Sequence, residues 1–186
     1  ITQTSSRVAL SIRQAAKNEA IKMAAATKTQ SWLAEPVKRI GQGVQSPVYV
    51  IDVIQTKLED ISKVSVVATP EDITKLGFKV ADAIADFADD LAEIAEPTSD
   101  DDANVDAMQA LAQQIAYDLI QADKPLVVSG SSLSSTALIE AAAQITQALS
   151  QKRAAIKATE QHQVEAHNAM VRDEQVAAAE AQATTA

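Results

Sequence analysis

The chain has 186 residues, enough to bury a core; 47% of them are hydrophobic and only 3% are aromatic. Four glycines and five prolines leave little material for tight turns, so the composition favours long helices over β-sandwiches, β-barrels and carbohydrate clefts. The sequence contains no cysteine, which excludes disulfides, thiolate metal sites and cysteine nucleophiles.

The net charge of −9 is unevenly distributed along the chain. Residues 1–40 carry +5, residues 41–120 carry −12 and residues 121–186 carry −2. The overall acidity argues against nucleic acid as the main partner. The asymmetry suggests that a basic first segment meets an acidic middle segment, within one chain or between subunits.

Residues 5–34 have the pattern of one helix that starts at Ser5 or Ser6 and ends before Pro36. Apolar residues occupy one face, and a second apolar group lies on the opposite face among basic side chains. Two apolar faces need two surfaces to pack against, either in the chain's own bundle or on another subunit; a membrane surface is a weaker third alternative. The residues of this segment predicted to form an interface are Leu10, Arg13, Lys17, Ile21, Lys28 and Trp32.

Residues 35–47 contain two glycines and two prolines and are predicted to form a loop. Residues 48–66 have apolar side chains at helical spacing and are predicted to form a helix, although residues 48–51 are β-branched or aromatic and typical of a strand.

Residues 70–96 give the clearest helical pattern: Thr69 as a cap, Pro70 in the first turn and one narrow apolar stripe. A second helix is predicted at about residues 100–123, and a short connection would make the two an antiparallel hairpin. The acidic face of the first helix is either simply solvated or a docking surface, in which case the basic segment at residues 7–28 is its complement. Its predicted interface residues are Asp82, Asp86, Asp89 and Glu93.

Acidic residues at positions 100–106 have the spacing of a calcium loop, but Val105 and Leu111 occupy positions where such a loop needs glycine and glutamate. Acidic side chains in a first helical turn also complement the helix dipole without a metal. His162 and His167 lie five residues apart, which is the wrong spacing for a shared metal on a helix. The sequence therefore predicts no metal, cofactor or catalytic residue.

The stretch from residue 134 to residue 184 lacks glycine and proline and is predicted to form one long helix after a serine-rich hinge at 129–135. Its first half carries an apolar stripe and should pack on the body, whereas its second half lacks one and should project. His167, Met170 and Val171 are its predicted interface residues. The pattern of residues 166–169, Gln175 and residues 182–185 resembles the subunits of bacterial refractile bodies over this end alone.

Together these patterns predict an all-α protein, an antiparallel helical bundle with a long, partly projecting C-terminal helix. The predicted parts are a helical body at 1–128, the hinge at 129–135 and the long helix at 136–186. The predicted function is that of a non-enzymatic, self-assembling structural subunit of a filament, tube, shell or virion-like particle. Its partners would be further copies of the chain, held by helix burial and charge complementarity.

The alternative is a secreted helical protein that forms pores in membranes or remodels them. The sequence shows no signal peptide or membrane span in this chain, so the compartment stays open, with an extracellular or virion-like assembly as one place for it.

Overall fold

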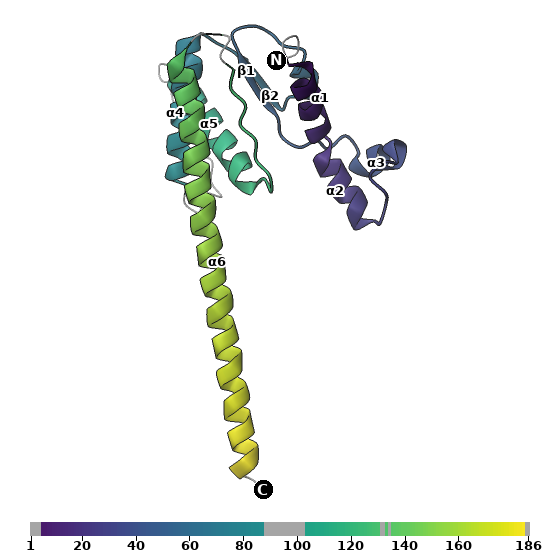
Figure 1. Cartoon of the computed structure of the whole chain (residues 1–186), viewed down its shortest axis with the longest axis vertical. Coiled ribbons are helices and arrows are strands. Elements are labelled where there is room, and N and C mark those ends of the chain that lie inside the picture. Colours follow the sequence, from purple (N-terminus) through teal and green to yellow (C-terminus); the bar gives the residue numbers. More distant parts are fainter. Residues whose placement is uncertain (1–4, 88–102, 131–132, 134, 185–186) are drawn as a thin grey trace.

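The computed structural model describes residues 5–87, 103–130, 133 and 135–184, except the side chains of 103–106, 166–169, 171 and 173–184. Helices dominate this part of the chain, and one small two-stranded sheet lies among them (Figure 1). The prediction of a mostly helical protein is confirmed, whereas the sheet departs from the all-α class.

Two short helices, α1 (Ser6–Ala15) and α2 (Asn18–Ala26), replace the single helix predicted at residues 5–34, and a third, α3 (Ala34–Gly41), lies within the predicted loop. The break between α1 and α2 is stabilised by Ser46. Its backbone N–H donates to the carbonyl of Ala16 at 2.8 Å, and its hydroxyl accepts from the backbone N–H of Glu19 at 3.1 Å. A distant residue therefore supplies partners at the point where the helical ladder is interrupted.

Pro36 lies inside the first turn of α3 and does not end a helix, so the predicted loop at 35–47 is wrong over its first part. Proline is tolerated there because the first N–H groups of a helix have no intrahelical acceptor. α3 packs against α2, where a Cβ added to Gly41 would lie 2.6 Å from the Cβ of Ala20.

The helix predicted at 48–66 is wrong, because this stretch forms β1 (Tyr49–Asp52), a 3-10 turn η1 (Glu59–Ile61) and β2 (Val64–Val67). The strands pair in parallel, from Tyr49 opposite Val64 to Asp52 opposite Val67. The β-branched residues at both ends of the stretch favour strands. The helical spacing was misleading, since Ile54 is 67% exposed and belongs to no buried stripe.

The main core lies where α4 (Pro70–Ala85), α5 (Ala103–Gln121) and α6 (Thr136–Thr184) meet. The hydroxyl of Thr69 accepts from the backbone N–H of Asp72 and caps α4, as the sequence predicts. The core residues are apolar and nearly inaccessible: Leu76, Val80, Ile84, Ala112, Ile115, Ala116, Ile120 and Leu149.

The contacts show that these three helices run in the same direction. Near the start of α4, a Cβ on Gly77 would lie 2.9 Å from Ala141 of α6. Just after α4, the ring of Phe87 lies 6.2 Å from that of Tyr117 in α5, and Lys152 of α6 donates to its carbonyl. The predicted antiparallel hairpin is therefore wrong. Residues 125–130, which form neither helix nor strand, lead back from the end of α5 towards the start of α6 (Figure 1).

α6 continues well past the ends of α4 and α5 (Figure 1). From residue 157 onward its described side chains are exposed. The division into a body, a hinge at 129–135 and a projecting helix stays a prediction.

We expect Gly77→Ala to destabilise the chain by about 1 kcal/mol, although alanine is the better helix former, because its Cβ would crowd Ala141. Ala141→Gly removes the obstructing methyl group. Chemical unfolding of both single variants and the double variant should show a coupling of about 1 kcal/mol in favour of the double. Strictly additive effects would contradict the close packing of α4 on α6.

Candidate functional site

The predicted interface residues of the first segment lie on α1, in the break before α2, on α2 and in the turn after α2. Leu10 and Lys17 are exposed, and Lys28 and Trp32 lie in the exposed turn between α2 and α3. Ile21 is half-buried against the small cluster shared by α2 and α3. The structure thus leaves most of these side chains accessible.

The basic side chains of α1 and α2 pair with acids other than those predicted. Arg13 contacts Asp60 at 2.6 Å and also donates to a backbone carbonyl beside η1, and Lys22 pairs with Asp123 after α5. The hydrogen bond from Arg13 lowers the pKa of Asp60, and the bond from Lys22 lowers the pKa of Asp123. These exposed ion pairs connect α1 and α2 to the rest of the chain.

The acidic face predicted on α4 is only partly described. Asp82 and Asp86 are exposed, and neither makes an ion pair with another described residue. Asp89 and Glu93 lie outside the described residues. In α6, Met170 is 60% exposed, whereas the side chains of His167 and Val171 are outside the description. The acidic run at 100–106 also falls outside the described side chains.

A polar cluster that the sequence patterns did not predict joins the sheet to α5. The hydroxyl of Tyr49 in β1 donates to Oδ2 of Asp118 in α5, and Nζ of Lys63, just before β2, lies 2.6 Å from the same oxygen. Lys63 also lies over the Tyr49 ring, 5.7 Å from its centre. The carboxylate is mostly buried, so these charge-assisted bonds orient the sheet on α5.

No local pattern could have revealed this cluster, because Tyr49 is 69 residues from Asp118 in sequence. The three groups satisfy one another's hydrogen-bonding capacity, and we call them the Asp118 brace. They hold the sheet on α5, and none of the three is a nucleophile with an open position beside it for a substrate.

Burial raises the pKa of Tyr49 above its ordinary value of 10.0, and the hydrogen bond to Asp118 acts in the same direction. The folded chain therefore holds the phenolic proton more tightly than the unfolded chain. This stabilisation is complete below pH 10 and is lost as the pH rises beyond it. We expect Tyr49→Phe to flatten that alkaline loss, measured as unfolding midpoints in urea below and above pH 10; an unchanged pH profile would contradict it.

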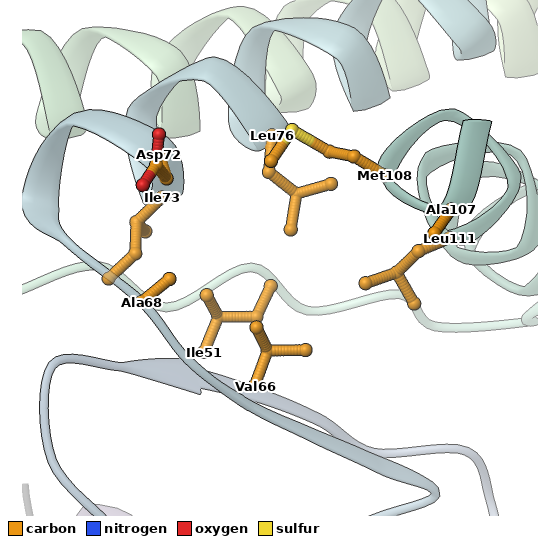
Figure 2. A pocket seen from close by; sticks show the side chains of 9 residues that line it. All are labelled: Ile51, Val66, Ala68, Asp72, Ile73, Leu76, Ala107, Met108 and Leu111. Atoms are coloured by element: carbon orange, nitrogen blue, oxygen red, sulfur yellow. The ribbon is translucent and has the colours of Figure 1, made fainter. Parts of the chain in front are cut away.

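An apolar pocket of about 190 Å³ lies between the sheet and the first turns of α4 and α5 (Figure 2). Eight of its nine lining residues are apolar, and the ninth, Asp72, bonds the Thr69 hydroxyl and Lys75. Small-molecule sites typically measure about 300–1,000 Å³. This pocket is a packing gap with no reactive group, and no cluster of metal-ligating side chains occurs among the described residues.

Comparison with known proteins indicates a function, which the geometry of the described residues alone does not. No family model matches the chain. Over 149 residues it is 47% identical to the G subunit of NADH-quinone oxidoreductase from Pseudomonas putida KT2440, 42% to that of Pseudomonas fluorescens and 38% to that of Escherichia coli K12. These relatives are subunits of an oxidoreductase. Each match covers 80% of this chain, and the chain spans only 15% of each relative's length.

These matches correct the functional predictions made from the sequence. A self-assembling subunit of a filament or virion-like particle is wrong, and so is the secreted pore-forming alternative, because the relatives are named as enzyme subunits. The prediction of a non-enzymatic protein is contradicted for the same reason. No described helix has the length and apolarity to cross a membrane.

The predicted partners and location are corrected too. The word subunit in the relatives' names indicates unlike partner chains, where the sequence patterns suggested copies of one chain. An extracellular or virion-like assembly does not agree with an NADH-quinone oxidoreductase. The resemblance of residues 166–185 to refractile-body subunits does not identify the family, since the match over 149 residues is to an oxidoreductase chain.

Proposed function

We propose that this chain is the counterpart of one segment of the G subunit of NADH-quinone oxidoreductase and acts as part of that enzyme. The observation that carries the proposal is the identity of 47% over 149 residues, which covers 80% of the chain. The same name recurs at 38% identity in Escherichia coli K12.

The contribution that we propose for this segment is structural. Iron–sulfur clusters are held mainly by cysteine thiolates, and this sequence contains none. The polar groups around Asp118 bond one another, and the apolar pocket is small. The segment therefore supports the folding and docking of the whole G subunit, while electron transfer between NADH and quinone takes place elsewhere in the enzyme.

Within that role the parts of the chain have distinct tasks. α4, α5 and the first half of α6 pack together around the core at Ile84. The serine-rich residues 129–135 lie between α5 and α6 in the sequence, and the second half of α6 extends past this core. We propose that the body at 1–128, the hinge at 129–135 and the long helix at 136–186 act as separate structural parts in the assembled enzyme.

An exchange experiment tests the proposal. The matching segment of the Escherichia coli K12 G subunit is replaced by this chain, in a strain whose own copy of that gene has been removed. We expect the purified enzyme to keep NADH-dependent quinone reduction and its full set of subunits. Deletion of the segment should prevent assembly.

Two controls define the outcome. An exchanged segment carrying Ile84→Asp, which places a charge at a fully buried position, should fail like the deletion. Assembly and activity lost with the unmodified chain, while the native segment supports both, would show that the two segments are not equivalent and would refute the proposal.

A further inference from the structure

The two-stranded sheet has an open edge along β1. The backbone carbonyls of Val48 and Asp52 accept hydrogen bonds from N–H groups on the β2 side, at 2.8 and 3.1 Å. Because successive residues of a strand direct their backbone groups to opposite edges, those of Tyr49 and Ile51 face away from β2. No backbone hydrogen bond outside the sheet involves either residue in the described part of the chain.

This open edge is less exposed than the open edge of β2. All four residues of β1 are half-buried, whereas the outward-facing residues of β2, Ser65 and Val67, are exposed. Water can bond the backbone of β2, but it is partly excluded at β1, where an unpaired N–H or C=O group costs free energy. A two-stranded sheet is also marginal without further packing. The edge of β1 is therefore the place where a third strand would stabilise the sheet most.

Residues 125–130 have the sequence of a strand but no strand partner. Leu126, Val127 and Val128 are apolar, and a proline precedes them while a serine and a glycine follow. No backbone hydrogen bond joins the segment to another described residue. Its exposure alternates, since Pro125 and Val127 are half-buried and the two residues at 126 and 128 are exposed. This alternation is typical of a strand with one face on a core.

The segment runs in the same direction as β1. β2 ends at Val67 and leads directly into α4, just as residues 125–130 lead towards the start of α6 (Figure 1). α4 and α6 begin at the same end of the helical core, because Gly77 and Ala141 pack closely near the two helix starts. Residues 125–130 and β2 therefore approach the same end of the helices, and β1 is parallel to β2.

The start of the segment also lies near the start of β1. Tyr49, the first residue of β1, donates its hydroxyl hydrogen to Asp118, three residues before α5 ends at Gln121. Pro125 follows the end of α5 after a further three residues. The two stretches therefore start beside the same end of α5 and run the same way.

We propose that residues 126–128 close onto the open edge of β1 as a third parallel strand, with Val127 opposite Ile51. In this register the N–H of Val128 donates to the carbonyl of Ile51, and the carbonyl of Leu126 accepts from the N–H of Ile51. The N–H of Leu126 donates to the carbonyl of Tyr49. This inference goes beyond the proposed function and does not depend on it.

The burial of the segment and the position of its proline both agree with this register. Paired residues of parallel strands have their side chains on one face, so Val127 would join Ile51 on the core side, and Pro125 would lie on that side too. Leu126, which is 69% exposed, would lie beside Val50 on the opposite face. The missing N–H of Pro125 would face away from β1, where no donor is needed. A shift by one residue in either direction would exchange the two faces.

Pairs of introduced cysteines in the full chain test the closure, since the sequence has no cysteine of its own. In the proposed register Val50 and Leu126 are neighbours on one face, at a separation that a disulfide can span. Val50→Cys with Leu126→Cys should form an intramolecular disulfide at least about tenfold faster than Val50→Cys with Val127→Cys, whose side chains would lie on opposite faces. Mass spectrometry of peptides, after free thiols are blocked at timed intervals, measures both rates.

Amide hydrogen exchange of the unmodified chain, followed residue by residue by NMR, tests the register without any substitution. The N–H groups of Leu126 and Val128 should exchange at least about tenfold more slowly than in an unstructured peptide, because each donates to β1. The N–H of Val127 faces away from β1 and should exchange at nearly the unstructured rate.

The inference requires both results. Disulfide formation that is no faster for the Val50/Leu126 pair than for the Val50/Val127 pair would show that the segment does not close in this register. Exchange at the same rate for Leu126, Val127 and Val128 would refute it independently, and in either case the proposed function would be unaffected.

Discussion

Replacing Ile84 with alanine is expected to lower the free energy of unfolding by about 3–4 kcal/mol. Ile84 is 0% exposed and lies in α4 at the centre of the cluster that α4 shares with α5 and α6. Removing three carbons there costs the transfer free energy of the lost groups and leaves a void that three tightly packed helices cannot fill. Urea unfolding followed by circular dichroism at a helical wavelength measures the change.

Ile54 provides the matched control, since the same substitution removes the same atoms from a side chain that is 67% exposed. Ile54→Ala should change the free energy of unfolding by less than about 0.5 kcal/mol. Equal effects of the two substitutions would show that the core does not lie around α4.

The sequence predicts α4 well because its signals are local. Thr69, Pro70 and the acidic first turn fix where the helix starts, and its apolar stripe faces the core as expected. The exposure of the second half of α6 follows from the same kind of local pattern. In both places the residues that decide the structure are neighbours in sequence.

The predictions of secondary structure failed where contacts between residues far apart in the sequence determine the structure. Ser46 supplies the hydrogen bonds at the break between α1 and α2, and nothing within residues 5–34 shows this. Residues 49–52 become a strand because residues 64–67 are available to pair with them. The parallel course of α4, α5 and α6 is set by contacts between residues far apart in the sequence, which helical periodicity does not describe.

The functional error has a different physical origin. Apolar and basic side chains on α1–α3 and along α6 are exposed, and the sequence patterns were interpreted as contacts between copies of one chain. Binding surfaces for like and unlike partners have similar compositions, so exposure and charge cannot distinguish them. The similarity to an oxidoreductase chain over 149 residues made that distinction.

The brace at Asp118 leads to the second large expected effect: Asp118→Ala should cost about 2 kcal/mol of unfolding free energy. Its loss leaves the Tyr49 hydroxyl and the Lys63 ammonium in a half-buried place without their shared acceptor. The cost falls short of that for breaking a fully buried ion pair because the Lys63 side chain is 41% exposed and water can partly solvate it.

Three further variants separate the contributions in the same urea unfolding assay. Asp118→Asn keeps an acceptor and removes the charge, so it should recover part of the loss. Tyr49→Phe should cost less in the Asp118→Ala background than alone, because the two groups share one hydrogen bond. Asp60→Ala breaks the more exposed pair with Arg13 and should have a much smaller effect. If Asp118→Ala and Asp60→Ala proved equal, the carboxylate of Asp118 would not hold the sheet on α5, and the position of the sheet against that helix would have to come from apolar packing, such as that of Ile51 and Val66.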